Sequence, residues 1–289
     1  MEACDVIRLF VNKALFYKQP KRVGNPGYGP LKSIRVLVFA RLKGLTNDTR
    51  LVEYLKKHKQ TTNKLGLTTV PDRTTVGRWW KRYLLLLEEV FNKLADMLVM
   101  VLPTTLLVVD STPLVDLFDS EASWGKSSRG WFKGFKLHTS VNQQGLPLRA
   151  KVTPANCYDS PILPDIAWDL KATYLLADAG YDSKLNRQVA KSVGAVAVIA
   201  KNRRKSGKNK SKNKVKAMYS ELLRAKRYLV EQFNGHFKAN LLKDCYLRPK
   251  GLAKKSAMVY AALISYVAEG LRALLCDEIS LKSVSKYWA

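Results

Sequence analysis

The sequence predicts an α/β protein, in which a mixed β-sheet flanked by helices follows a helical N-terminal region. Short apolar runs rich in leucine and valine are typical of buried strands, and helical stretches separate them. Two adjacent segments alternate apolar and polar residues across a glycine-containing turn, as paired antiparallel strands do. The first hundred residues, by contrast, are predicted to be helical. The apolar runs are 104–110, 172–178 and 195–200, and the alternating segments are 132–142 and 143–155.

This change of texture near residue 100 predicts two domains. Residues 1–100 are expected to form a helical, DNA-binding region. Residues 101–289 are expected to form the α/β domain, with elements in the order β, β, β, α, β, α, β, α, α. The predicted helices of that domain are 160–170, 183–192, 216–238 and 252–275.

The helical region contains a segment that could contact DNA. A turn at Pro71–Asp72 and a threonine cap predict a long helix from about Thr75. Its first turns interleave basic and aromatic residues, which suits contact with phosphates and bases. In the alternative interpretation, the tryptophans belong to the core and the charges are merely solvated. Both interpretations are open for Arg78, Trp79, Trp80, Lys81 and Arg82.

The net charge indicates a polyanionic partner. Lysine and arginine total 50, against 23 aspartate and glutamate residues, which gives a formal net charge of +27. Such an excess opposes folding through self-repulsion, and its usual benefit is attraction to nucleic acid. We therefore expect a nucleic-acid-binding protein.

Several other classes of protein and site are disfavoured. The four cysteines show no CxxC spacing and no accompanying histidine cluster, which disfavours a zinc site. Glu2 and Asp5 interrupt any signal-peptide pattern. The apolar stretch 97–109 is broken by Pro103 and is too short to cross a membrane. The expected location is the cytoplasm, without membrane association.

A basic segment lies between the last predicted strand and the long helix that follows it. Residues 201–216 hold nine lysines or arginines, among them Arg203 and Arg204, and no acidic residue. Such a block cannot bury itself, so we expect a mobile loop. It would either track DNA phosphates or serve as a solvated linker; the number of charges favours the first.

Two aspartates close apolar strand runs. Asp110 ends the run 104–110, and Asp178 ends the run 172–178. Strand ends are where open α/β sheets place ligands, and a carboxylate there needs a cation or hydrogen bonds to offset its desolvation. Alternatively, each aspartate caps a turn. Together, on neighbouring strands, they are better candidates for a metal site than either alone.

The helix 216–238 supplies a further carboxylate. Its periodicity places Arg224, Arg227, Glu231 and Lys238 in one narrow stripe, opposite an apolar face. From periodicity alone, a solvated face with an Arg227–Glu231 pair is the favoured interpretation. Two aspartates and a glutamate would nonetheless suit magnesium, which prefers hard oxygen ligands and cleaves phosphodiesters with two ions roughly 3.5–4 Å apart.

An ordered set of motifs resembles the DDE transposases of prokaryotic insertion sequences. The pieces are VVDST, GFKLHTSVNQQGLPL, TPANCYDS, LADAGYDS and RAKRYLVEQFNGHFK, with PDRTTVGRWWKR before them. The resemblance covers roughly residues 70–270. It implies an RNase H-like catalytic core with Asp110, Asp178 and Glu231 as catalytic, metal-binding residues. The implied cofactor is Mg²⁺ or Mn²⁺, as two ions.

The family's helix signature runs Tyr, Arg, Glu, Lys. Arg227, Glu231 and Lys238 match it, whereas Arg224 stands where the family has tyrosine. The resemblance implies that Arg227 and Lys238 position the DNA backbone, and an arginine at 224 could still contact phosphate.

Other polar residues near these motifs are expected to have structural roles. Asp182 competes with Asp178 for the second metal position, but capping a helix start is its better interpretation. Asp159 is likewise expected to cap the helix that follows it. His138 lies in mid-strand on the face shared with Lys136 and Ser140, and a structural role is favoured over a role in the site.

The function implied by the resemblance is that of an insertion-sequence transposase. Such a protein would bind double-stranded DNA at the element ends, cut it with metal assistance and join it to target DNA. A homodimer on DNA and a nucleoid-associated, cytoplasmic location are expected. A nuclease that cuts without joining and a DNA-binding protein without activity are the alternatives.

Overall fold

The computed structural model describes residues 3–14, 27–127, 130–200, 214–243 and 248–275. Contacts divide the chain into two compact units. The α/β unit spans residues 99–235, and the helical unit combines residues 1–98 with the chain from His236 onward. This division differs from the expected boundary at residue 100, because the helix 252–275 groups with the N-terminal helices.

The helical unit is built around its C-terminal helix α10 (Leu252–Leu275), which packs against α1, α2 and α5. Among the described helices, α10 alone is long and apolar enough to cross a membrane, but 89% of its most apolar window is buried inside the fold, as in the core helix of a soluble protein. A buried Glu269–Arg272 ion pair of 2.6 Å also lies on it. The other helices are α1 (Ala3–Ala14), α2 (Gly29–Leu42), α3 (Asp48–Lys57), α4 (Lys59–Lys64), α5 (Arg73–Arg82), α6 (Leu84–Val101) and the π-helical turn η3 (Phe237–Leu242).

The predicted long helix from Thr75 is instead two helices. Asp72, rather than a threonine, caps α5 by accepting a hydrogen bond of 2.9 Å from the Thr75 N–H. The helix ends at Arg82 with Tyr83 as its C-cap, and α6 begins at Leu84. Periodicity does not reveal this break because apolar residues continue across it.

The α/β unit contains a six-stranded mixed sheet. β1 pairs antiparallel with β3 and parallel with β5, and β6 extends the parallel side. β4 and β2 both pair antiparallel with β3, on the edge away from β1, since Gly134 pairs with Val115 on one side and Ser123 on the other. The strands are β1 (Leu106–Val115), β2 (Ser123–Ser127), β3 (Gly130–Val141), β4 (Pro147–Pro154), β5 (Tyr174–Ala177) and β6 (Val196–Ile199).

β1 extends five residues beyond Asp110, where the apolar run ends. Its first half lies between β3 and β5, whereas its second half pairs with β3. The strand β2 was not predicted, because its sequence SWGKS lacks an apolar run.

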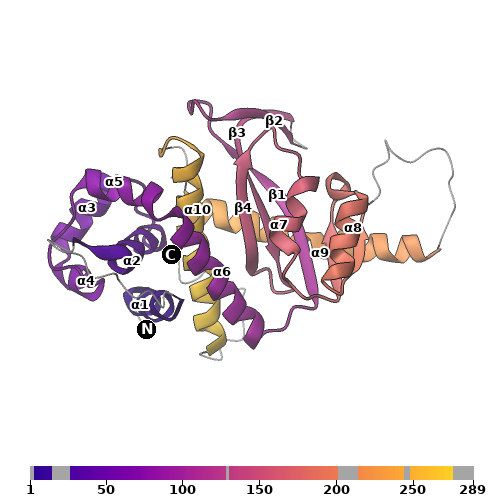
Figure 1. Cartoon of the computed structure of the whole chain (residues 1–289), viewed down its shortest axis with the longest axis horizontal. Helices are drawn as coiled ribbons and strands as arrows, with labels where there is room; N and C mark the ends of the chain where they lie inside the picture. The colour runs from indigo at the N-terminus through magenta and orange to yellow at the C-terminus, as the bar shows by residue number, and fades with distance from the viewer. Residues whose placement is uncertain (1–2, 15–26, 128–129, 201–213, 244–247, 276–289) are drawn as a thin grey trace. The chain divides into compact units, whose positions relative to one another are not determined.

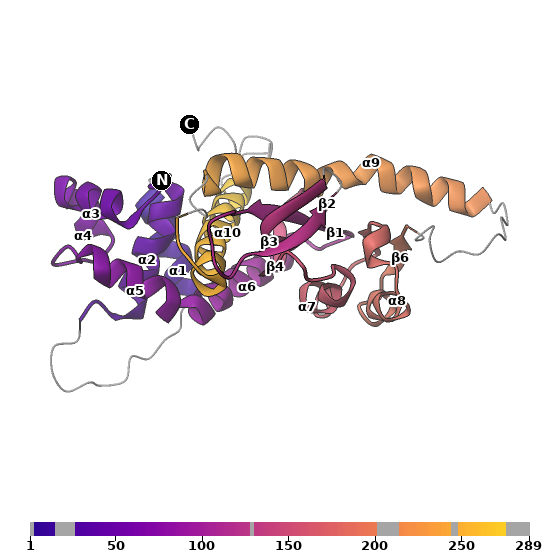
Figure 2. The same ribbon diagram turned by 90° about the horizontal axis from the view of Figure 1, so that it is seen from above.

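Helices cover both faces of this sheet. Helix α9 (Lys214–His236) runs along one face, and α7 (Leu163–Ala167) and α8 (Lys184–Ser192) lie on the other (Figures 1 and 2). The predicted helix 160–170 is shorter, a 3₁₀ turn η1 (Ser160–Ile162) leading into α7. A second 3₁₀ turn, η2 (Ala179–Tyr181), follows β5. Buried Leu229, Val230 and Phe233 form the apolar side of α9.

Candidate functional site

The parallel pairing of β1 with β5 places Asp110 and Asp178 side by side. Val109 pairs with Ala177, so the two aspartates follow paired residues on adjacent strands. Asp178 accepts a hydrogen bond of 2.8 Å from the Gly180 N–H, which confirms that it also opens a turn. Asp110 instead lies within β1, opposite Thr139, so its interpretation as a turn cap is wrong.

Asp110 is a largely buried carboxylate that is surrounded by other charged groups. Its side chain is 16% exposed, and burial raises the pKa of its carboxyl group to about 6. The Ser111 N–H and Arg227 oppose this rise in pKa, whereas the nearby carboxylates Asp178 and Glu231 add to it. At neutral pH the Asp110 carboxyl group is ionised, and its burial makes that charge unfavourable. A bound cation would offset this free-energy cost.

Helix α9 brings a cation to this carboxylate. The guanidinium of Arg227 lies 3.8 Å from Asp110 Oδ2 and 3.4 Å from Glu231 Oε1. Arg227 therefore bridges the strand aspartate and the helix glutamate. The i,i+4 pair expected from periodicity is present, but it points at Asp110 rather than into open solvent. The Glu231 side chain itself remains 60% exposed.

The donor chemistry of this site suits a hard divalent cation. Asp110 carries the electrostatic influence of both Asp178 and Glu231, so three carboxylates share one neighbourhood. Within the described residues, however, no three acidic, histidine or cysteine side chains are close enough to ligate one ion. Arg227 supplies the positive charge between two of them. The carboxylates are thus of the chemical type that binds magnesium, but their side chains do not form a closed coordination shell.

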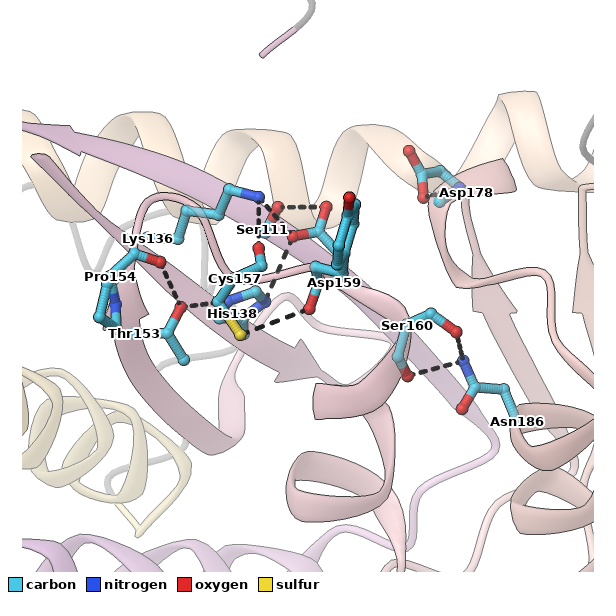
Figure 3. Close-up of polar contacts among 12 residues, drawn as sticks. Ser111, Lys136, His138, Thr153, Pro154, Cys157, Asp159, Ser160, Asp178 and Asn186 are labelled. Carbon is cyan, nitrogen blue, oxygen red and sulfur yellow. Dashed lines mark hydrogen bonds and ion pairs between the residues drawn. The ribbon is translucent and has the colours of Figure 1, made fainter. Parts of the chain in front are cut away.

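Asp159 organises a second polar network next to the site. It accepts hydrogen bonds from Lys136 Nζ at 2.9 Å and from Ser111 Oγ at 3.1 Å (Figure 3). The Lys136–Asp159 pair is largely buried, with side-chain exposures of 12% and 23%. The expected helix-capping role of Asp159 is wrong, because its side chain makes no capping bond to the turn after it.

This network meets β1 at Ser111, the residue after Asp110. Successive side chains of a strand point to opposite faces, so Ser111 points away from Asp110. Lys136 also donates to the Cys157 carbonyl at 2.9 Å, which ties β3 to the segment that carries Asp159. The network fixes the backbone of β1 at the position from which Asp110 projects.

His138 belongs to this network as a neutral side chain. It is fully buried, its Nε2 lies 2.9 Å from Thr153 Oγ1, and its Nδ1 lies 3.8 Å from Asp159 Oδ1. Burial lowers the pKa of His138 to about 4, although Asp159 acts to raise it. The imidazole is therefore uncharged at neutral pH, which suits the structural role favoured for it.

Tyr181 and Asp182 lie in the loop that follows Asp178. The capping role expected of Asp182 is wrong: Ser183 caps α8 by accepting a hydrogen bond from the Asn186 N–H, and Asp182 pairs with Arg187 at 2.6 Å. Tyr181 is fully buried, and its pKa is raised well above 10 by burial and by the charges of Asp159, Asp110 and Asp178. The phenol thus stays protonated beside all three aspartates.

The helical unit contains a strongly basic cavity of about 820 Å³. Its described lining includes one acid, Asp48, whose Oδ1 accepts from the Trp80 indole N–H at 2.9 Å. Among the described residues, none of its basic side chains has an ion-pair partner. The basic residues are Arg73, Arg78, Lys81 and Arg82 from α5, and Arg248 and Lys254 from the start of the α10 region.

The structure settles where the tryptophans of the α5 segment lie, but not whether its basic residues contact DNA. Trp79 and Trp80 are buried, so they belong to the core. Arg78, Lys81 and Arg82 are exposed and face the cavity. Their role in DNA binding remains a proposal.

Other predicted DNA-binding residues are not placed at either site. Arg203 and Arg204 lie outside the described residues, as does most of the segment 201–216, and the side chain of Arg224 is also outside them. Lys238 lies in η3, which belongs to the helical unit, so its position beside Glu231 remains a prediction.

The sheet order and its carboxylates define the class of protein. An antiparallel meander of β1, β3 and β4, continued by parallel β5 and β6, with an aspartate in β1, is an RNase H-like core. A DDE transposase domain model matches residues 85–244, and a transposase domain model matches residues 3–82. The chain therefore belongs to the DDE transposases.

A curated relative is consistent with this family. The transposase for insertion sequence element IS1106 of Neisseria meningitidis serogroup B is 33% identical over 142 residues. The match covers 48% of this chain and 47% of that protein, so the chain spans about half the length of its relative. No solved structure matches.

Proposed function

We propose that this protein is the transposase of an insertion sequence, which binds the element's DNA ends, cuts them with the help of divalent metal ions and joins them to target DNA. The observation that carries the proposal is the juxtaposition of Asp110 and Asp178 by strand register, with Glu231 linked to Asp110 through Arg227. The family membership supports the same chemistry.

Asp110, Asp178 and Glu231 would hold Mg²⁺ or Mn²⁺, two ions in the simplest arrangement. The metal would supply a nucleophile at neutral pH and neutralise charge on the attacking and leaving oxygens. Asp110, which feels the charge of both other carboxylates, would share in holding the metal. The DNA backbone would bring its own phosphate charges to this cluster.

Arg227 would have two successive partners. Without metal, its guanidinium neutralises Asp110 and Glu231. Asp110 and Glu231 would hold the metal, which would supply the positive charge that Arg227 provides in its absence. Arg227 would then be free to contact a DNA phosphate, for which its planar donor set is suited. The buried network of Asp159 would keep β1 in place during this exchange.

Asp178→Asn and Glu231→Gln test this assignment. Each is expected to lower cleavage of DNA carrying the element's ends, and transfer of a pre-cut 3′ end, by roughly 10²-fold or more in Mg²⁺, because metal stabilisation is worth several kcal/mol. Joining products are resolved on sequencing gels, with Asp165→Asn, a change in an exposed ion pair, as the control. Full activity in either triad variant contradicts its place in the site; cutting without joining by the unaltered chain indicates a nuclease.

The basic cavity of the helical unit would bind DNA phosphates. Arg248→Gln combined with Lys254→Gln is expected to weaken binding of duplex DNA about 10-fold near 0.15 M salt, and to reduce the slope of log affinity against log salt by about 2. Fluorescence anisotropy in EDTA measures both quantities without cleavage.

Lys56→Gln combined with Lys57→Gln is the matched control for these cavity changes. It removes the same charge from an exposed part of α3 outside the cavity lining. Equal losses in the two double variants would mean that only the overall charge of the chain matters, and would exclude a phosphate site in the cavity.

Assembly and location follow from the same proposal. Joining two element ends in one reaction calls for a homodimer on DNA, as the family implies. A protein with this substrate and a net charge of +27 would associate with the nucleoid in the cytoplasm.

A further inference from the structure

The paired strands β2 and β3 carry two tryptophans and two lysines on one face. In their antiparallel register, Trp124 pairs with Lys133 and Lys126 pairs with Trp131. Directly opposed residues point to the same face, and residues two apart on a strand share that face. Trp124, Lys126, Trp131 and Lys133 therefore alternate in a two-by-two pattern, called here the tryptophan–lysine face.

Both tryptophans of this face are open to solvent. Trp124 is 60% exposed and Trp131 is 70% exposed. Lys126 Nζ lies 5.9 Å from the centre of the Trp131 ring, within the range of a cation–π contact. Large aromatic side chains that are exposed together usually mark a binding surface, because a protein without a partner there would be more stable with them buried.

The opposite face of the same strands is held in place. Gly125 and Phe132, which pair with each other, are both buried. A Cβ atom at Gly125 would lie 2.3 Å from the Ala155 carbonyl oxygen, so the backbone of β2 packs directly against the segment after β4. The tryptophan–lysine face is thus presented on a backbone whose position is fixed, and its rings need little ordering to bind a partner.

We propose that the tryptophan–lysine face binds unpaired nucleotides of the DNA substrate, with bases stacked on Trp124 and Trp131 and phosphates held by Lys126 and Lys133. Aromatic side chains interleaved with cations are the chemistry that recognises single strands, since every base offers a π face and every nucleotide a charge. Within a duplex the bases already stack on one another, so the face selects unpaired DNA.

The face lies in the unit that carries the carboxylates. Val115, at the end of β1, pairs with Gly134 next to the lysine at 133, and lies five residues along the strand from Asp110. At about 3.3 Å per residue this corresponds to roughly 17 Å, a span of a few nucleotides. This proposal rests on the proposed function because it takes DNA as the substrate. It adds that DNA strands near the cleavage point bind to the protein while they are unpaired.

The test uses the full chain in EDTA with three fluorescein-labelled probes: a fully paired duplex, the same duplex with an unpaired tail, and oligo(dT). Trp124→Ala and Trp131→Ala are each expected to weaken binding of the tailed duplex and of oligo(dT) about 10-fold. Binding of the fully paired duplex should change less than about 2-fold, because its bases are stacked internally. Phenylalanine at either position should retain most of the affinity.

Trp168→Ala is the matched control, since Trp168 is a 66% exposed tryptophan of the same unit that lies outside the paired strands. Equal losses on paired and unpaired DNA, or no loss, would overturn the proposal. So would a preference for an RNA strand of the same length over DNA, or altered self-association in sedimentation with unchanged DNA affinity, which would assign the face to a second copy of the chain. DNA binding is measured without metal, so it does not depend on whether Asp110, Asp178 and Glu231 are the cleavage residues. Likewise, a negative binding result would not contradict the assignment of those three residues.

Discussion

Asp110→Asn is expected to lower DNA cleavage about 10³-fold and, at the same time, to make the metal-free protein more stable. The loss follows from removing a proposed metal ligand, because metal stabilisation of several kcal/mol corresponds to this factor at about 1.4 kcal/mol per tenfold. The gain in stability follows because the ionised Asp110 carboxylate is largely buried and lies near the carboxylates of Asp178 and Glu231. Both conditions disfavour its charge. An amide keeps the shape and still accepts from the Ser111 N–H.

The stability gain should depend on pH in a defined direction. The pKa of the Asp110 carboxyl group is 3.8 in its unperturbed form and about 6 in the folded protein. The folded state therefore favours the protonated acid, and the stability due to that acid is complete below 3.8 and lost as pH rises through about 6. The variant should match the unaltered chain near pH 4 and exceed it by about 1–3 kcal/mol at pH 8.

Thermal or urea unfolding in EDTA across this pH range measures the difference. Glu231→Gln serves as the control, because that side chain is largely exposed and its neutralisation should barely change stability. Added Mg²⁺ should then stabilise the unaltered chain more than the Asp110→Asn variant. A variant less stable than the unaltered chain at pH 8 would show that Asp110 is a structural acid rather than a ligand held ready for metal.

Asp159→Asn is expected to destabilise the α/β unit by about 2–4 kcal/mol, because it leaves the Lys136 ammonium buried without its anion. Cleavage should also fall about 10-fold, since small displacements of a catalytic group cost that much or more. The bond from Ser111 to residue 159 would weaken, and β1 would lose a contact one residue from Asp110.

Asp165→Asn is the control for Asp159→Asn. Lys151 and Asp165 form an ion pair whose partners are both close to half exposed, and such pairs contribute less than about 1 kcal/mol. Urea unfolding of the two variants separates buried from exposed pairing. A second change, Lys136→Met in the Asp159→Asn background, should recover part of the stability without recovering full cleavage. Full recovery of cleavage would show that the network contributes stability but does not position Asp110.

The sequence alone was sufficient to place the two aspartates on neighbouring strands and to predict five of the six strands of their sheet. Buried strands leave compact apolar runs, so a polar residue closing such a run stands out at Asp110 and Asp178. Glu231 was different. A helix periodicity places it among exposed charges, which is where it lies, and the family signature was needed to associate it with the aspartates.

The remaining features depend on contacts between distant segments. Asp159 looks like a helix cap because an acid before Ser160 has that local pattern; its true partners, Lys136 and Ser111, are set by strand register. Arg248 and Lys254 join α5 in one cavity although more than 160 positions separate them from it, and both lie outside the matched family ranges. The strand β2 carries too few apolar residues to be recognised without its pairing to β3.

The helical unit is assembled from both ends of the chain, with the α/β unit inserted between them. During synthesis, the sheet and its three carboxylates are complete before α10 has been made. A chain that stops short of α10 would therefore contain the three proposed metal ligands but lack the helix around which the other helices of the helical unit pack, and part of the basic cavity. Premature termination would therefore separate the proposed metal site from the proposed phosphate-binding cavity.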